Sequence, residues 1–188
     1  MRQSLEFLLV LLLLLPACGP APYSCTDPLG CLEVSPGNPI VIGTILATIG
    51  EQRLSGSESL QSVEKAVANK NELLGHPIQL LHNGTDCTID NARGAATEFA
   101  TYPDLSAVIG PTCTDEAVIA VPILLSAGIP LLGPVPNSAV AYELTNQILA
   151  AIEQVAVQMP DKTLYIPRQA LADAVLPTPE FHPRSDER

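Results

Sequence analysis

The chain has 188 residues, with 20 Asp and Glu against 9 Lys and Arg, and a net charge of −11. This length allows one ordinary domain or one lobe of a larger protein, and so acidic a chain is a poor candidate for binding nucleic acid. Tryptophan is absent and aromatic residues are scarce, so the core must be built from Leu, Ile, Val and Ala.

Residues 1–18 have the pattern of an export signal. Arg2 is followed by a leucine-rich run, residues 7–15, which is shorter than the ~20 apolar residues that span a bilayer. The tetrapeptide Leu15-Pro16-Ala17-Cys18 resembles the lipobox of bacterial lipoproteins, in which the cysteine carries the lipid. We therefore expect an exported chain, lipid-anchored through Cys18 to the periplasmic or extracellular face of a cell membrane. The alternative is an ordinary cleaved signal.

Four further cysteines remain, an even number for an oxidising compartment. Three pairings are possible. We favour Cys25–Cys31, which closes a loop containing Pro and Gly, together with Cys87–Cys113, which would stabilise the fold by roughly 3 kcal/mol. Metal binding and redox chemistry are the rival interpretations. The C-x5-C spacing of the first pair and the lack of a nearby histidine argue against a metal site, and we expect none.

Residues 19–39 are rich in Pro, Gly and Ser, and are expected to form a tether with a small disulfide loop. Strands and helices then alternate along the chain. Short apolar runs predict strands at Ile40–Leu46, Pro77–His82, Ser106–Ile109 and Ile129–Leu132. Amphipathic spacing predicts helices at Ser57–Leu74, Thr88–Tyr102 and Asp115–Ala127. Gly75 is the expected stop of the first helix, and Thr88 or Asp90 the expected N-cap of the second.

Uniformly apolar strands that alternate with helices indicate an α/β fold with a doubly wound, mainly parallel sheet of about four strands. In such sheets ligands bind beyond the carboxyl ends of the strands. No G-x-G-x-x-G follows the first strand and no Walker A pattern occurs, which argues against a nucleotide fold.

Several stretches resemble the type 1 periplasmic substrate-binding proteins of branched-chain amino acid ABC transporters. PIVIGTILA is similar to the first strand of that family, and AVANKNELLGHPIQLLHNGTDC to its first helix, turn and second strand. AVIGPTCTDEA followed by PILLSAGIPLLGPVPNS is the most specific match. The similarity runs from Tyr23 to about Asn137. It implies one lobe of the type 1 periplasmic binding fold, an amino acid as ligand and an ABC transporter permease as partner.

The segments AYELTNQILAAIEQVAVQ and TLYIPRQALADAV resemble pieces that the family places near its C-terminal end. The resemblance therefore implies a single lobe over residues 40–176. Residues 40–137 form its N-terminal part, and 141–176 are a late helix and C-terminal segment. By the same resemblance, the second lobe of the family would be missing, at a junction near Ser138–Ala141. Residues 177–188 are expected to be a disordered tail.

The resemblance also implies which residues bind. The loop after the third strand gives Cys113 and Thr114, of which Thr114 is the better candidate to hold a ligand carboxylate, at a helix N-terminus. In the loop after the fourth strand, Val135 would offer its carbonyl to an ammonium group, and Asn137 can donate or accept. The alternatives are that Thr114 only caps its helix and that the other positions serve loop geometry.

The expected function is extracytoplasmic solute binding, impaired because one lobe leaves the ligand in water. The alternative is a structural or interaction lipoprotein, or a relic. Enzyme motifs such as G-x-S-x-G, H-E-x-x-H and C-x-x-C are absent from the sequence, and His76, His82 and His182 are scattered. We expect neither catalysis nor a cofactor.

Overall fold

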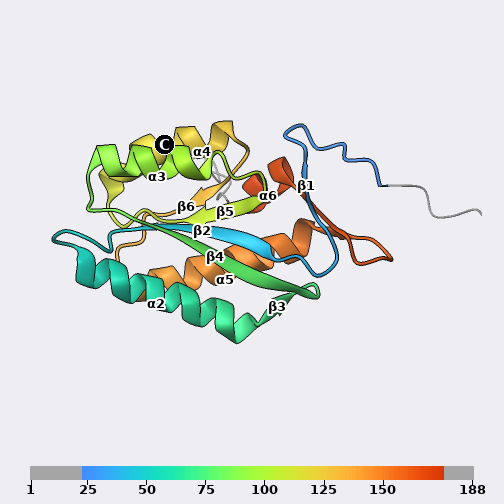
Figure 1. The fold of residues 1–188 in the computed structure, drawn as a ribbon, viewed down its shortest axis with the longest axis horizontal. Coiled ribbons are helices and arrows are strands. Elements are labelled where there is room, and N and C mark those ends of the chain that lie inside the picture. The colour runs from blue at the N-terminus through green and yellow to red at the C-terminus, as the bar shows by residue number, and fades with distance from the viewer. Residues whose placement is uncertain (1–22, 176–188) are drawn as a thin grey trace, which may run out of the picture.

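The computed structural model describes residues 23–175. The predicted signal with its lipidation residue Cys18 lies outside this range, as does the predicted tail at 177–188. The described chain forms a five-stranded sheet, in the order β3-β4-β2-β5-β6, with helices on both faces and a separate three-stranded sheet at one end (Figure 1).

The main sheet is built around β2 (Ile40–Leu46). This strand runs parallel to β4 (His76–Gly84) on one side and to β5 (Leu105–Ile109) on the other. The short strand β6 (Leu131–Leu132) continues the sheet in parallel with β5, and β3 (Glu72–Leu73) adds an antiparallel edge to β4. The four predicted parallel strands are confirmed, and with them the α/β fold class.

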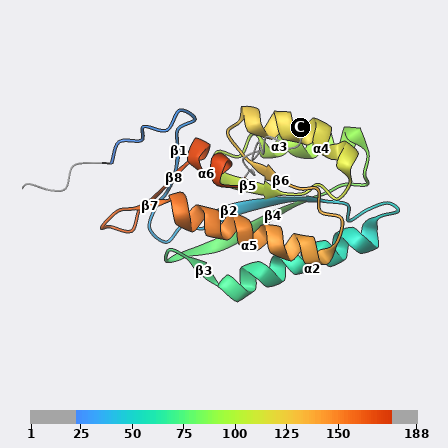
Figure 2. The same ribbon diagram turned by 180° about the vertical axis from the view of Figure 1, so that it is seen from behind.

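Helices α3 (Ile89–Phe99) and α4 (Thr114–Ser126) cover one face of the sheet, and α2 (Arg53–Lys70) and α5 (Ser138–Val155) cover the other (Figures 1 and 2). Successive side chains of a strand point to opposite faces, so β2 contributes to two cores. The core under α2 and α5 contains Ile40, Ile42, Val63 and Ile148, and the core under α3 and α4 contains Ile45, Phe99, Ala120 and Leu124.

The first helix is displaced toward the N-terminus from its predicted position. α2 ends at Lys70 because Asn71 takes a positive φ of 63°, a left-handed conformation that asparagine tolerates better than most residues. Leu74, the last residue of the predicted helix, instead lies in the tight turn between β3 and β4. For the second helix, Thr88 is confirmed as N-cap and accepts a hydrogen bond from the amide of Asn91 at 3.4 Å.

The segment expected to be a tether forms a strand over part of its length. β1 (Cys31–Val34) pairs antiparallel with β8 (Leu164–Pro167), which also pairs with β7 (Val157–Gln158). Leu32 and Val34 are buried, and the rings of Tyr23 and Tyr165 stack with centroids 4.5 Å apart. The last helix, α6 (Arg168–Val175), follows β8 directly.

Hydrogen bonds of His76 and Arg168 hold the small sheet against the amino end of the main sheet. The ring nitrogens of His76 lie 3.0 Å from the carbonyl oxygen of Asn38 and 2.9 Å from that of Lys162. The guanidinium of Arg168 donates to the carbonyls of Pro103 at 2.6 Å and Leu105 at 3.2 Å. The small sheet therefore sits opposite the edge where ligands are expected.

Between residues 23 and 175, every helix is too short or too polar to cross a membrane.

Candidate functional site at the carboxyl edge of the sheet

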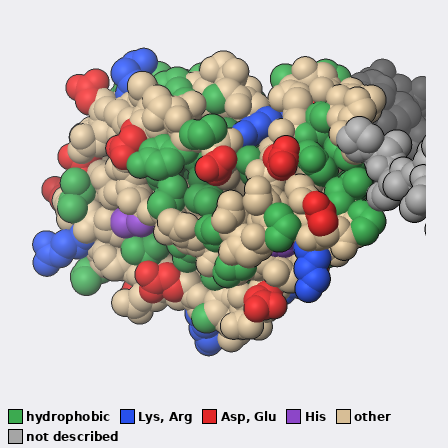
Figure 3. Space-filling model, turned by 45° about the vertical axis from the view of Figure 1, so that its right-hand side comes forward, with side chains coloured by type: hydrophobic (Ala, Val, Ile, Leu, Met, Phe, Trp, Pro, Cys, Tyr) green, Lys and Arg blue, Asp and Glu red, His purple; other side chains and the backbone are tan. Residues whose placement is uncertain are grey.

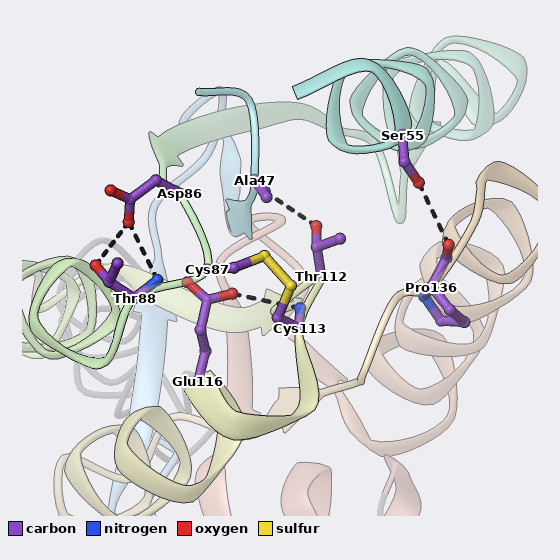
Figure 4. The surroundings of a disulfide bond; sticks show 9 residues. All are labelled: Ala47, Ser55, Asp86, Cys87, Thr88, Thr112, Cys113, Glu116 and Pro136. Atoms are coloured by element: carbon purple, nitrogen blue, oxygen red, sulfur yellow. Dashed lines mark hydrogen bonds between the residues drawn. A yellow bond between two sulfur atoms is a disulfide. The ribbon is translucent and has the colours of Figure 1, made fainter. Parts of the chain in front are cut away.

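Four loops meet where the parallel strands end, and hydrogen bonds hold them in fixed positions. The amide of Ala47, after β2, donates to Oγ1 of Thr112, after β5, at 3.0 Å (Figure 4). The amide of Ile49 donates to the carbonyl of Thr85, after β4, at 3.2 Å. Loops that are distant in sequence thus form one preorganised surface.

The loops after β5 and β6 approach each other more closely than side chains would allow. A Cβ on Gly133 would meet the carbonyl oxygen of Gly110, and a Cβ on Gly110 would meet that of Ile45. Gly110 also has a φ of 134°, which favours glycine. Beyond these glycines, the amide of Val135 donates to the carbonyl of Pro111 at 2.7 Å.

The disulfide Cys87–Cys113 is present as predicted, and so is Cys25–Cys31. Because β2 lies between β4 and β5 in the sheet, Cys87–Cys113 links loops that flank the end of β2. It also joins the starts of two helices, since Cys87 precedes the N-cap of α3 and Cys113 is the N-cap of α4. The disulfide therefore fixes the centre of this edge.

Glu116 lies beside that disulfide with its side chain fully buried (Figure 4). Its Oε2 accepts a hydrogen bond from the amide of Cys113 at 3.3 Å, whereas Oε1 has no partner among residues 23–175. Burial raises the pKa of this carboxyl, against the opposing effects of the Thr85 hydroxyl and the Cys113 amide. The Thr85 hydroxyl is near enough to act on the pKa, but it too is buried without a well-formed hydrogen bond.

The four predicted binding residues lie on this edge in different environments. Thr114 is exposed at the first position of α4, while Cys113 and not Thr114 is the N-cap. The side chain of Val135 is fully buried, so only its backbone is available to a ligand. Asn137 is exposed, and its Oδ1 accepts from the amide of Val140 at 3.0 Å as the N-cap of α5.

Acidic groups dominate the electrostatics of the edge. The hydroxyl of Thr88 is the main group that lowers the pKa of Asp86, with help from the Asn91 side chain, and Asp115 is exposed in the first turn of α4. These carboxylates partly offset the attraction of the α4 N-terminus for an anion. Figure 3 turns the end with the small sheet toward the viewer, and on that side acidic, basic and hydrophobic side chains are interspersed.

Sequence reasoning did not single out His82, which lies near this edge. Its Nδ1 is 2.8 Å from Oγ1 of Thr44 and its Nε2 is 3.0 Å from Oγ1 of Thr48. Burial of the ring lowers the pKa of His82, and the charge of Glu64 partly opposes this. The parallel register, which sets Thr44 opposite His82, brings the two together. The sequence alone does not predict this contact, because the contact depends on the register of the two strands.

In the described part of the chain, one group of potential metal ligands approaches closely. The sulfurs of Cys87 and Cys113 and a carboxylate oxygen of Glu116 lie within 4.8 Å of one another. The two sulfurs are bonded to each other, and a disulfide lacks the thiolates that bind metals. In this oxidised form, the group is not a metal site.

Comparison with solved structures shows which known fold this architecture resembles. A possible leucine/isoleucine/valine-binding protein from Rhodopirellula baltica matches 62% of this chain and 31% of its own length, with 18% identity and a TM-score of 0.50. The fold is that of one lobe of a type 1 periplasmic binding protein. The branched-chain amino acid transporter substrate-binding protein from Streptococcus pneumoniae, in complex with isoleucine, matches 50% of this chain and 28% of its own, with 24% identity and a TM-score of 0.47.

A solute-binding protein of an ABC transporter from R. palustris, in complex with 4-hydroxybenzoate, matches 50% of this chain and 26% of its own, with 21% identity and a TM-score of 0.47. The chain thus spans less than a third of the length of these structures. At 18% identity, the likeness to the R. baltica protein establishes the fold and not a ligand. No protein-family model matches the chain, and neither does any curated protein.

Proposed function

We propose that the chain is an extracytoplasmic solute-binding lipoprotein of an ABC transporter. It carries its lipid on Cys18 and binds an amino acid of the branched-chain type weakly, at the carboxyl edge of the sheet. It acts by binding and not by catalysis, and its protein partner is the transporter permease. In this proposal the chain contributes a single lobe, with the late helix following the junction at Ser138–Ala141 directly.

The observation that carries this proposal is the joined pair of loops after β5 and β6. The hydrogen bond from the amide of Val135 to the carbonyl of Pro111 holds them together, and α4 begins directly after the first of these loops. The first amides of a helix have no partner within the helix and attract a carboxylate. Thr114 stands at that position with an exposed hydroxyl.

The remaining predicted residues complete the proposed contacts. The carbonyl of Val135 and the carboxamide of Asn137 would face the ligand ammonium from the second loop, and Cys113 would position the first loop through its disulfide. The acidic surroundings favour a ligand that also carries a positive charge, and a zwitterionic amino acid meets this condition.

One lobe provides half of the contacts that a closed pair of lobes would provide. Hydrogen bonds that remain in water contribute little to affinity. We expect a Kd of about 1 mM, which corresponds to about 4 kcal/mol of binding free energy.

The test is an NMR titration of the full chain in detergent with leucine, isoleucine and valine. We expect saturable shifts of the amides of Thr114 and Val135 up to about 10 mM ligand. Thr114→Val should weaken binding, whereas Ser126→Ala, at the other end of α4, should not. A folded chain that shows no shifts at this edge would contradict the proposal.

A second candidate function is that of an interaction lipoprotein, favoured by apolar side chains near the same edge. Leu54 is 71% exposed and Ile49 is 50% exposed. If this surface binds a protein, Leu54→Ser with Ile49→Ser should abolish any self-association seen by analytical ultracentrifugation. Val157→Ser, at the other end of the molecule, is the control.

A further inference from the structure

The Cys87–Cys113 disulfide has a chemical environment that solute binding does not explain. The carboxyl of Glu116 is fully buried, yet one of its oxygens lies within 4.8 Å of both sulfurs. Its Oε2 is held by the amide of Cys113. Its Oε1 has no well-formed hydrogen bond among the described residues, although the Thr85 hydroxyl and the Cys87 amide lie near enough to lower the pKa of the carboxyl. In Figure 4 the carboxyl of Glu116 points toward the disulfide.

An unpaired buried carboxyl is costly, so its presence calls for an explanation. Capping α4 requires only one oxygen, so it does not account for the second. Burial raises the pKa of this carboxyl and so favours its protonated form, in which it holds a proton next to two sulfurs.

The two sulfurs are not equivalent. Cys113 is the N-cap of α4, where the helix N-terminus stabilises a thiolate and makes this sulfur the better leaving group. Cys87 lies in the loop before α3, with a positive φ of 68°. Both residues are partly exposed, so a small thiol can approach the bond.

We propose that Cys87–Cys113 is a thiol–disulfide exchange site whose substrate is an external dithiol, and that Glu116 is its proton donor. This inference is independent of the proposed solute binding. A thiolate of the dithiol attacks Sγ of Cys87. The Sγ–Sγ bond breaks, and its electron pair goes to Sγ of Cys113, which takes the proton from Glu116.

The mixed disulfide on Cys87 resolves in a second step. The other thiolate of the dithiol attacks the sulfur of its own molecule that is bound to Cys87, and Cys87 leaves as a thiolate that is protonated by water. Glu116 regains its proton from solvent. In total, the protein disulfide gains two electrons and two protons, and the dithiol is oxidised to a disulfide.

The chain contains its own control, the disulfide Cys25–Cys31. The hydroxyl of Tyr23 lies 4.0 Å from Sγ of Cys31. Among the described residues, this disulfide belongs to no such cluster of sulfurs and carboxylate. Both disulfides can be followed in one sample. An alkylating reagent stops the reaction and labels the free thiols, and mass spectrometry then identifies the labelled cysteines.

The experiment measures the rate at which dithiothreitol reduces each disulfide in the full folded chain, from acidic to mildly alkaline pH. After correction for the thiolate fraction of the reagent, the rate for Cys87–Cys113 should fall as pH rises, because Glu116 loses its proton. Glu116→Gln should slow this reduction at least about tenfold in the acidic range and flatten its pH profile. It should leave Cys25–Cys31 unchanged. Glu58→Gln, an exposed acid of α2, should behave like the unmodified chain.

Two results would overturn the proposal. One is a Glu116→Gln variant that is reduced at the original rate with the original pH profile. The other is measured on the unmodified chain and so does not depend on whether the variant folds. It is a reduction rate of Cys87–Cys113 that equals the rate of global unfolding, or a corrected pH profile that is the same as that of Cys25–Cys31.

Discussion

The carboxylate of Asp27 accepts a hydrogen bond from the amide of Gln169, 142 residues later in the chain. Its second oxygen accepts from the amide of Ala170 at 3.1 Å. Asp27 lies in the small loop closed by Cys25–Cys31, and the two amides belong to the first turn of α6. A loop near the start of the described chain therefore caps its last helix.

Replacing Asp27 by Ala should lower the free energy of unfolding by about 1 kcal/mol, the usual effect of losing an N-cap. Burial acts to raise the pKa of Asp27, but the amides of Gln169, Leu29 and Ala170 together outweigh it, so the pKa is lowered. The stabilisation is therefore present above the unfolded-state pKa and is lost as pH falls through the folded-state pKa. Urea unfolding of the variant and the unmodified chain at neutral and acidic pH measures this loss. If the two chains differ in free energy of unfolding by the same amount at both pH values, the assignment is contradicted.

Gly110→Ala and Gly133→Ala should each destabilise the fold by about 2 kcal/mol or more, since the added methyl group meets a backbone carbonyl oxygen. Gly94 is the matched control, because it lies in α3 with nothing within 4 Å of an added Cβ. Gly94→Ala should stabilise by about 0.5–1 kcal/mol. Thermal unfolding of the three variants measures these changes in stability. Equal changes in all three would show that the loops after β5 and β6 are not closely packed.

His82 should titrate below its ordinary range, and Glu64→Gln should lower its pKa further by removing an attractive charge. The unfolded chain then binds the proton more tightly than the folded chain, so protonation of His82 favours unfolding as pH falls. An NMR titration of the imidazole measures the shift. Glu58→Gln, also an exposed acid of α2, should leave the pKa unchanged. A rise of the pKa in Glu64→Gln would refute the assigned interaction.

Glu116→Gln should raise stability at neutral pH relative to acidic pH. A carboxyl whose pKa is raised in the folded state binds its proton more tightly there, so stability falls as pH rises from the unfolded-state pKa to the folded-state pKa. Glutamine keeps an oxygen for the Cys113 amide and does not ionise. Chemical unfolding of both chains against pH should show curves that diverge as pH rises, and parallel curves would exclude a buried ionisable Glu116.

The main sheet could be predicted because its strands are short apolar runs between clear helical patterns. The strands β1 and β8 could not, since they form only by pairing Cys31–Val34 with Leu164–Pro167 across the whole chain. The Pro and Gly residues around β1 favour a flexible segment when only local sequence is considered. The strands β3 and β7 have two residues each, too few for any periodicity.

The sequence predicts that the candidate loops share one edge of the sheet, but not the contacts within that edge. Alternating strands and helices indicate that the loops containing Thr114 and Asn137 share one edge. Which hydroxyl faces inward depends on the packed loops. Thr112 and not Thr114 accepts the hydrogen bond from Ala47. The sequence does not single out Glu116, because its burial depends on the turn at Cys113 and on the loop after β4.

The small sheet has a mechanical consequence if the chain is tethered at Cys18. A pull transmitted through Tyr23 reaches the fold at β1, which is held to β8 by the pairs from Cys31 with Pro167 to Val34 with Leu164. This ladder, the Asp27 cap and the stacked tyrosines would resist tension before any force reached β2. The loops at the opposite edge of the main sheet would keep their shape while the tether is stretched.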